Sequence, residues 1–285
     1  MNKWNRTQLL PDRPGIPPMA KMPEPETIDV EALAGALSRG EYDCVCVLGP
    51  TASGKTRYAV QLAKQLREIP GTSPRMTEGM TAEILSADSR QVYRGMDIGT
   101  GKDLGEYGDV PYHLIDIVPA GAKFNIYQYQ EAFAKAFKDV KSRGAIPIIC
   151  GGSGLYIESV TRAYKFEKGN GLSEDVLPKN TYYIGTLVSR EERVARIDHR
   201  LEARLKEGLV EEVRGLLQTV PADDLIYYGL EYKFVTEYLL GKYSYDDMVM
   251  FLGNAIHQFA KRQMTWFRGM ERDGAVIHWV LPFKK

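Results

Sequence analysis

Eight consecutive residues near the start of the chain have the types and spacing of a phosphate-binding loop. In order, they are Gly49, Pro50, Thr51, Ala52, Ser53, Gly54, Lys55 and Thr56. They match the pattern Gly-x-x-x-x-Gly-Lys-Ser/Thr, in which backbone amides at the start of a helix form an anion pocket. Lys55 adds a positive charge to this pocket, and the hydroxyl of Thr56 can bind Mg²⁺. The sequence therefore predicts a di- or triphosphate site, and it leaves open hydrolysis, phosphoryl transfer and release of diphosphate.

The segments on both sides of this loop predict the context that the pattern requires. The run 43–48 before the loop is largely apolar and is typical of a buried strand, and 57–66 after it has apolar residues at helical spacing. A strand, a glycine-rich turn and a helix are expected in this order around a phosphate-binding loop. The alternative, a chance match in a glycine-rich turn, is disfavoured by these flanking segments.

A carboxylate is expected at the same edge of the sheet as the phosphate loop. The run 81–87 predicts a second strand, and Asp88 follows it directly. Because ligands of open α/β sheets bind outside the carboxyl ends of the strands, Asp88 is a candidate catalytic or binding group. An aspartate in this place can equally cap the start of a helix, and the two roles are compatible.

Two further segments have residue types that suit a binding site. Gly151-Gly152-Ser153-Gly154 follows an apolar run and forms a second glycine-rich turn, for which close helix–strand packing is the simpler explanation. The segment 244–270 has the periodicity of a long helix, and its polar face carries Lys261, Arg262 and Arg268. A basic face of this kind can be merely solvated or can contact nucleic-acid phosphates, and the residues alone leave both open.

The composition of the chain sets limits on its class. Among 285 residues, 37 are basic and 37 are acidic, so bulk charge predicts binding neither to nucleic acid nor to a membrane. Cys44, Cys46 and Cys150 lie in apolar runs without metal-ligand spacing, which is typical of buried thiols in a reducing cytosol. The chain shows neither an apolar run of membrane-spanning length nor the apolar region of a signal peptide, so we expect a cytoplasmic protein.

The order of the expected elements predicts an α/β fold. The expected strands are 43–48, 81–87, 111–117, 145–150 and 181–188, the last being the final strand of the sheet unless 275–280 adds a short one. The expected helices are 28–39, 57–66, 125–143, 189–206, 208–218, 229–240 and 244–270, and the turn 151–154 is expected to open a further helix through 155–157. This alternation indicates a P-loop NTPase-like, mostly parallel sheet covered by helices on both faces, with additional C-terminal helices. Residues 1–40 are expected to form a proline-rich, partly disordered arm, and 41–285 a single domain.

Several segments, taken together and in this order, resemble the tRNA dimethylallyltransferases, also called tRNA isopentenyltransferases. The resemblance rests on the segments 49–56, 88–102, 113–116, 151–156 and 260–268. It implies transfer of a dimethylallyl group from dimethylallyl diphosphate to N6 of the adenosine that follows the anticodon in tRNA, with release of diphosphate.

The resemblance also implies roles for individual residues. The phosphate loop would hold the diphosphate leaving group, with Mg²⁺ at Thr56. Asp88 matches the general base of the family, Thr51 a residue near the reacting atoms, and Arg190 a catalytic arginine that contacts the diphosphate. The positions that match tRNA- or acceptor-binding segments are Asp88, Ser89, Arg90, Gln91, Ser153, Tyr228, Gly229, Lys233, Lys261, Arg262 and Arg268.

The chain departs from the family pattern mainly in one segment. Family members carry a helical insertion with an arginine-rich helix before the last strand, and here only 162–180 occupies that place. The expected partners remain dimethylallyl diphosphate and tRNA, without a membrane and with a monomer favoured. The open alternatives are prenyl transfer to a free adenine nucleotide, as in adenylate isopentenyltransferases, a small-molecule P-loop kinase, and a non-catalytic nucleic-acid-binding protein.

Overall fold

The computed structural model describes residues 22–69, 81–162 and 176–282. Residues 1–21 of the expected arm and residues 163–175 of the expected short insertion lie outside the described residues. In the remainder of the arm, α1 Val30–Ser38 is a helix, and the side chain of Asp29 caps it by accepting the amide of Ala32.

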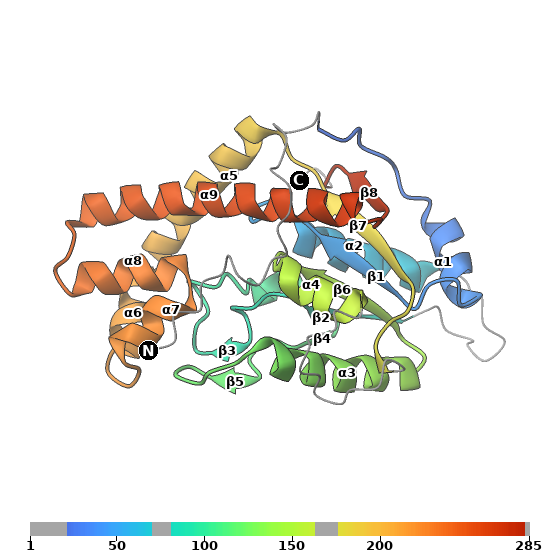
Figure 1. The fold of residues 1–285 in the computed structure, drawn as a ribbon, viewed down its shortest axis with the longest axis horizontal. Coiled ribbons are helices and arrows are strands. Elements are labelled where there is room, and N and C mark those ends of the chain that lie inside the picture. Colours follow the sequence, from blue (N-terminus) through green and yellow to red (C-terminus); the bar gives the residue numbers. More distant parts are fainter. Residues whose placement is uncertain (1–21, 70–80, 163–175, 283–285) are drawn as a thin grey trace.

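The centre of the molecule is a parallel sheet (Figure 1). Among the described residues, six strands form it in the order β4-β2-β6-β1-β7-β8. Their bounds are β1 Cys44–Leu48, β2 Ala82–Ser86, β4 Tyr112–His113, β6 Ile146–Gly151, β7 Thr181–Thr186 and β8 Ile277–Val280. Every residue of β1 is buried, and β1 pairs with β6 on one side and β7 on the other. The strand that leads into the phosphate loop therefore lies inside the sheet, and the predicted fold class is confirmed.

Two features of the sheet differ from the expectation. β7 is not the final strand, because β8 pairs parallel to it and forms the edge. The strand expected at 111–117 contributes only β4, since Leu114 and Asp116 have positive φ angles of 66° and 57° that end the extended conformation. Beyond this bend, β5 Val118–Pro119 pairs instead with β3 Tyr93–Arg94 in a separate two-stranded sheet.

Helices cover both faces of the sheet. Alternate side chains of a strand point to opposite faces. Cys46 of β1 lies in an apolar cluster with residues of α3 Ile126–Ser142 and α4 Gly154–Thr161. Val47 lies in the opposite cluster, with residues of α1 and α2 Lys55–Glu68. The sheet is thus a middle layer, and only its strand ends are available for a site.

In the described part of the chain, the segment between β7 and β8 is helical. Its helices are α5 Arg190–Glu207, α6 Leu209–Leu216, α7 Ala222–Tyr228, α8 Leu230–Leu239 and α9 Tyr245–Arg272. The sequence did not predict α7, because seven residues are too few to show a helical period. None of the described helices combines the length and the apolar composition that crossing a bilayer requires.

Helix α9 joins the helical layer to the sheet (Figure 1). Met248 and Leu252 in its first half lie in an apolar cluster with residues of α5 to α8. Phe267 and Met270 in its second half lie in the core between the sheet, α3 and α4. Since a single 28-residue helix takes part in both cores, it holds the helical layer in a fixed position relative to the strand ends.

A single carboxylate fastens the loop after β3 to the helical layer. Oε2 of Glu212 accepts the amides of Asp97 at 2.8 Å and Ile98 at 2.7 Å. Its Oε1 accepts the amide of Gly99 at 3.0 Å and the hydroxyl of Tyr232 at 2.7 Å. Three consecutive backbone amides of the loop thus bind the carboxylate of a residue in α6.

We expect Glu212→Gln to lower the free energy of unfolding by about 1–3 kcal/mol, because the new amide group would face N–H donors and leave them without an acceptor. Urea denaturation measures this. The neighbouring exposed Glu211 gives the control, since Glu211→Gln should stay within about 0.5 kcal/mol of wild type. Equal stability of the two variants would contradict the role of Glu212.

Candidate active site

The phosphate loop lies between β1 and α2, as predicted, and its shape depends on Gly54 and on the side chain of Thr186 in β7. Gly54 precedes the first turn of α2 with a positive φ of 80°, a conformation that favours glycine. Ser53 is buried, and its Oγ lies 2.6 Å from Oγ1 of Thr186. A Cβ at Gly49 would stand only 2.2 Å from that same Thr186 oxygen. The loop therefore has little freedom before any ligand binds.

Lys55 concentrates positive charge inside the loop. Although solvent reaches part of the side chain, the dense protein around its ammonium group lowers the pKa of Lys55. The positive charges of Arg200 and Arg204 lower this pKa further, whereas Cys150 and Asp88 act in the opposite direction. A bound anion would relieve this crowding of cations, so the charge distribution suits a di- or triphosphate.

One face of α5 supplies further arginines to the loop. Arg190, the residue predicted from the sequence, is exposed in the first turn of α5, which Ser189 caps through the amide of Glu192. Further along the same helix, Nη1 of Arg196 would stand 3.8 Å from a Cβ placed on Gly54. Sequence reasoning missed the arginines that follow Arg190, although their spacing of three or four residues already placed them on one helical face.

A small cavity continues the site between the phosphate loop and α5. Its lining residues are Thr51, Ala52, Ile197, Arg200, Leu201, Arg204, Glu231 and Ile256. The guanidinium of Arg204 is buried against Glu231, with 3.1 Å between Nη1 and Oε1. Arg200 donates to Oδ2 of Asp103 at 2.5 Å. Both arginines of this wall are therefore ion-paired, but they remain close enough to Lys55 for their charges to lower its pKa.

Asp88 lies directly after β2, where the sequence placed it. Its Oδ1 accepts the amide of Arg90 at 2.9 Å, so Asp88 caps a turn and not a helix. Its other oxygen, Oδ2, accepts no hydrogen bond from any residue that the structure describes. One carboxylate oxygen thus fixes the group, and the second is available to a substrate.

Ser89, after β2, and Ser153, in the second glycine-rich turn, are brought together. The amide of Ser89 donates to Oγ of Ser153 at 3.0 Å. Gln91, by contrast, is buried, and its amide group bridges Oγ of Ser86 and the carbonyl of Gly101 at 3.0 and 3.2 Å. A contact between Gln91 and an acceptor, as the sequence predicted, would require one of these bonds to open.

In the predicted acceptor segment around Gly229, the exposed tyrosine is Tyr227 and not Tyr228, the residue predicted from the sequence. Tyr228 is buried, and its hydroxyl donates to the carbonyl of Ala122 at 2.8 Å. Tyr227 has 68% of its surface exposed, and Nη1 of Arg90 donates to its carbonyl at 3.4 Å. The structure therefore places Arg90 beside Gly229 and the backbone of Tyr227, whose ring is exposed. Lys233 lies farther along, half-buried on α8, with its Nζ 5.4 Å from the ring centroid of Phe234.

The basic residues of α9 do not form one uniform face. Lys261 and Arg262 are exposed, whereas Arg268 is partly buried and pairs with Glu271 at 2.5 Å. Between them, Gln263 is buried and reaches the phosphate loop, where its Oε1 accepts the amide of Thr51 at 2.8 Å. Sequence reasoning missed Gln263, since nothing in the helical pattern sets it apart from other polar positions.

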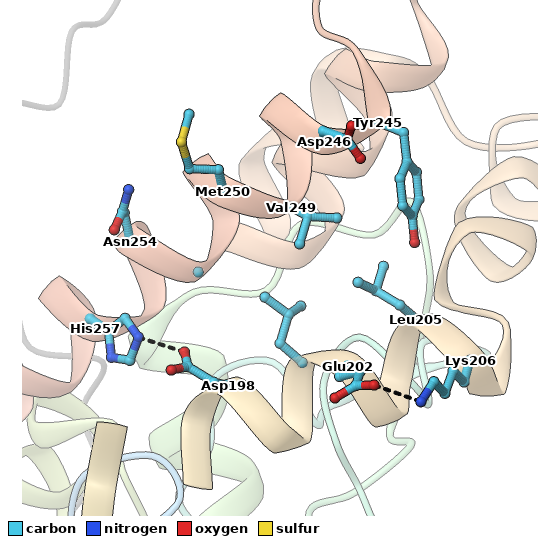
Figure 2. Close-up of a pocket in the computed structure, with 12 residues that line it drawn as sticks. Asp198, Glu202, Leu205, Lys206, Tyr245, Asp246, Val249, Met250, Asn254 and His257 are labelled. Atoms are coloured by element: carbon cyan, nitrogen blue, oxygen red, sulfur yellow. Dashed lines mark hydrogen bonds and ion pairs between the residues drawn. The ribbon is translucent and has the colours of Figure 1, made fainter. Parts of the chain in front are cut away.

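A groove of about 720 Å³ between α5 and α9 lies apart from these residues (Figure 2). His257 and Asp198 face each other across it at 2.8 Å, and Glu202 pairs with Lys206 at 2.6 Å. Met250 is exposed on its α9 wall. Neither the phosphate loop nor Asp88 contributes to its lining, so the groove is separate from the candidate active site.

The residues present suit a magnesium ion only when a phosphate accompanies it. Within the described residues, no cluster of three or more His, Cys, Asp or Glu side chains could hold a metal ion. Thr56 offers one hydroxyl, which lies against the thiol of Cys150. Mg²⁺ commonly takes most of its ligands from water and substrate phosphates, so this single hydroxyl is compatible with an ion that arrives with a diphosphate.

Comparisons with known proteins agree on one family. The family model described as IPP transferase matches residues 91–177 and 166–270. The tRNA dimethylallyltransferase 2 of Bacteroides fragilis is 43% identical over 298 residues, which cover 84% of this chain and 93% of the relative. The tRNA dimethylallyltransferase 1 of Porphyromonas gingivalis is 45% identical over 294 residues, with 83% and 93% covered.

Solved structures show the same fold. A tRNA isopentenylpyrophosphate transferase from Staphylococcus epidermidis has a TM-score of 0.68 and 28% identity, with 84% of this chain and 93% of that chain covered. A eukaryotic dimethylallyltransferase described as acting on tRNA has a TM-score of 0.68, with 84% of this chain and 74% of that chain covered. At 17% identity, the second comparison shows a shared fold alone.

Lys55→Ala should weaken the binding of inorganic diphosphate roughly ten- to hundredfold, because hydrogen bonds to charged groups contribute about 1.5–3 kcal/mol. Only the protonated lysine attracts the anion. Since the pKa of Lys55 is lowered, wild-type affinity should begin to fall with rising pH below the ordinary lysine pKa of about 10.4. Calorimetric titration over a pH series measures both effects.

The exposed Lys64 on the same helix gives the matched control, since Lys64→Ala removes an equal charge away from the loop. That variant should keep wild-type affinity for diphosphate. Similar losses in the two variants would show that only general charge matters at this site.

Proposed function

Because this chain belongs to the tRNA dimethylallyltransferases of the IPP transferase family, we propose that it transfers a dimethylallyl group from dimethylallyl diphosphate to N6 of an adenosine in tRNA. The acceptor would be the adenosine that follows the anticodon. The observation that carries this proposal is the arrangement at the carboxyl edge of the sheet. There the phosphate loop follows β1, and an aspartate with an available oxygen follows β2. The second glycine-rich turn follows β6, which lies between these two strands, and it joins the two segments.

The donor half of the site suits a diphosphate leaving group. As the bond between the allylic carbon and oxygen breaks, the electron pair stays on the diphosphate, and the growing negative charge requires stabilisation. The loop amides, Lys55 and the arginines of α5, including Arg190, would supply it. Mg²⁺ bound to the diphosphate and to Thr56 would add Lewis-acid stabilisation of the same oxygens. The hydroxyl of Thr51 would lie beside the bridging oxygen.

The acceptor half of the site suits an adenine amine. The amine nitrogen attacks the allylic carbon, and its proton passes to Oδ2 of Asp88 as the new bond forms. A base turned out of the anticodon loop, as enzymes that modify bases require, would lie near Ser89, Arg90 and Ser153. The exposed ring of Tyr227 offers a stacking surface beside it.

Binding of the tRNA backbone would fall to the exposed cations. Lys261 and Arg262 are free of ion pairs with other described residues and suit phosphate contacts. Arg268 would first have to leave Glu271. Of the remaining positions, Gly229 contributes backbone beside Arg90, and Lys233 contributes a charge at the rim of the helical layer.

The shorter insertion is compatible with tRNA as the acceptor. The alignment with the Bacteroides fragilis relative runs over 298 residues although it takes in only 84% of this 285-residue chain, so the relative has segments that this chain lacks. The two matches of the family model overlap at 166–177, within the segment 162–180 where we expected the helical insertion to be shortened. Because the relatives matched over most of their length are named for tRNA, the free-nucleotide and kinase alternatives are not favoured.

An acceptor assay tests the proposed function directly. The chain is incubated with labelled dimethylallyl diphosphate and, in separate reactions, bulk tRNA, AMP or ATP. We expect label in tRNA and none in AMP. Label in AMP alone would identify a nucleotide prenyltransferase, and ATP hydrolysis without transfer of label would identify a kinase or NTPase.

Asp88→Asn should lower kcat by roughly 10²–10⁴-fold, since the variant loses the proton acceptor but keeps the oxygen that caps the turn. Affinity for inorganic diphosphate should remain near wild type. Single-turnover transfer to tRNA and calorimetry measure the two quantities. The control Asp139→Asn, on the exposed side of α3, should keep full activity, and wild-type turnover in Asp88→Asn would exclude the base.

A further inference from the structure

A buried glutamine on α9 occupies the junction of the two glycine-rich turns. Gln263 is 8% exposed and lies on the inner face of the helix with Ala260, Met264 and Phe267. Its neighbours in sequence, Lys261 and Arg262, are on the outer face. An amide buried at this depth is costly unless both of its ends are hydrogen-bonded.

Both ends of this amide have a backbone partner, one in each turn. Oε1 accepts the amide of Thr51 at 2.8 Å, and Nε2 donates to the carbonyl of Gly152 at 2.9 Å. If the amide group were turned over, Nε2 would face the N–H of Thr51 and Oε1 would face the carbonyl of Gly152. Neither pair could form a hydrogen bond, so the orientation of the side chain is determined. The contact is also tight, since a Cβ on Gly152 would lie 2.5 Å from Nε2 of Gln263.

The two backbone partners belong to the two halves of the site. Thr51 is the loop residue expected beside the bridging oxygen of the donor. Gly152 precedes Ser153, whose Oγ accepts the amide of Ser89 next to the carboxylate of Asp88. Gln263 is therefore the short connection between the residue at the leaving group and the segment that carries the base.

We propose that Gln263 is a positioning residue that sets the separation of Thr51 and Asp88, and so the distance over which the amine attacks the allylic carbon. This inference rests on the proposed function. A displacement of about 1 Å in reacting groups can cost a hundredfold in rate without loss of binding. The role of Gln263 should thus lie in kcat and not in the affinity for either substrate.

The test compares Gln263→Met with Gln130→Met. Gln130 is the matched control, because it is buried to the same degree on α3 and donates to the carbonyl of Ser159 at 2.8 Å. We expect Gln263→Met to lower kcat for transfer to tRNA by about ten- to hundredfold, with little change in either KM. Gln130→Met should lose comparable stability and keep its kcat.

A second measurement separates positioning from general damage. Since Gln263 holds the main chain of Thr51, its effect should largely vanish once the hydroxyl is removed. In a Thr51→Ala background, Gln263→Met should therefore change kcat by no more than about twofold. Effects of independent substitutions add only to within about this factor, so a change of this size counts as no further effect. A full additional loss in this background, or equal kcat in the Gln263 and Gln130 variants, would overturn the inference.

Should Gln263→Met fail to fold, Gln263→Asn gives the same comparison, because its shorter side chain keeps an amide but cannot reach both partners. Failure of the proposed function and failure of this inference give different results. A wild-type chain that transfers no dimethylallyl group would overturn the proposed function and this inference with it. An active wild type with an unaffected Gln263 variant would overturn this inference alone.

Discussion

The close approach of the two glycine-rich turns to neighbouring strands at the carboxyl edge of the sheet is the constraint on which the site depends. A Cβ on Gly49 would lie 2.2 Å from Oγ1 of Thr186, and one on Gly151 would lie 2.2 Å from the carbonyl of Ala87. Only glycine permits both contacts. Because the two turns are held against β7 and β2 in this way, the phosphate loop and Asp88 take their positions from the sheet itself.

Local charge matters more here than the charge of the whole chain. The chain has equal numbers of acidic and basic residues, yet Lys55 lies close enough to Arg200 and Arg204 for their charges to lower its pKa. The arginines are partly balanced by Asp103 and Glu231. A diphosphate would complete this balance, which explains how a neutral protein can bind a strongly anionic donor.

Helix α9 performs two tasks because its faces have different neighbours. Its inner face carries Phe267 into the core and Gln263 to the phosphate loop. Its outer face leaves Lys261 and Arg262 in solvent. A helix that packs in two cores cannot move independently of either, so a tRNA held on the outer face would be held at a fixed distance from the donor.

The sequence by itself determined the parts of this protein that rest on neighbouring residues. The phosphate loop and the carboxylate after β2 were both predictable, because a few consecutive residues specify each geometry. Only the tertiary structure decided that Tyr227 is exposed and Tyr228 buried, that β8 forms the sheet edge, and that Gln263 meets Thr51. Those features depend on contacts between segments far apart in the chain, and no local pattern records which distant surface a side chain will meet.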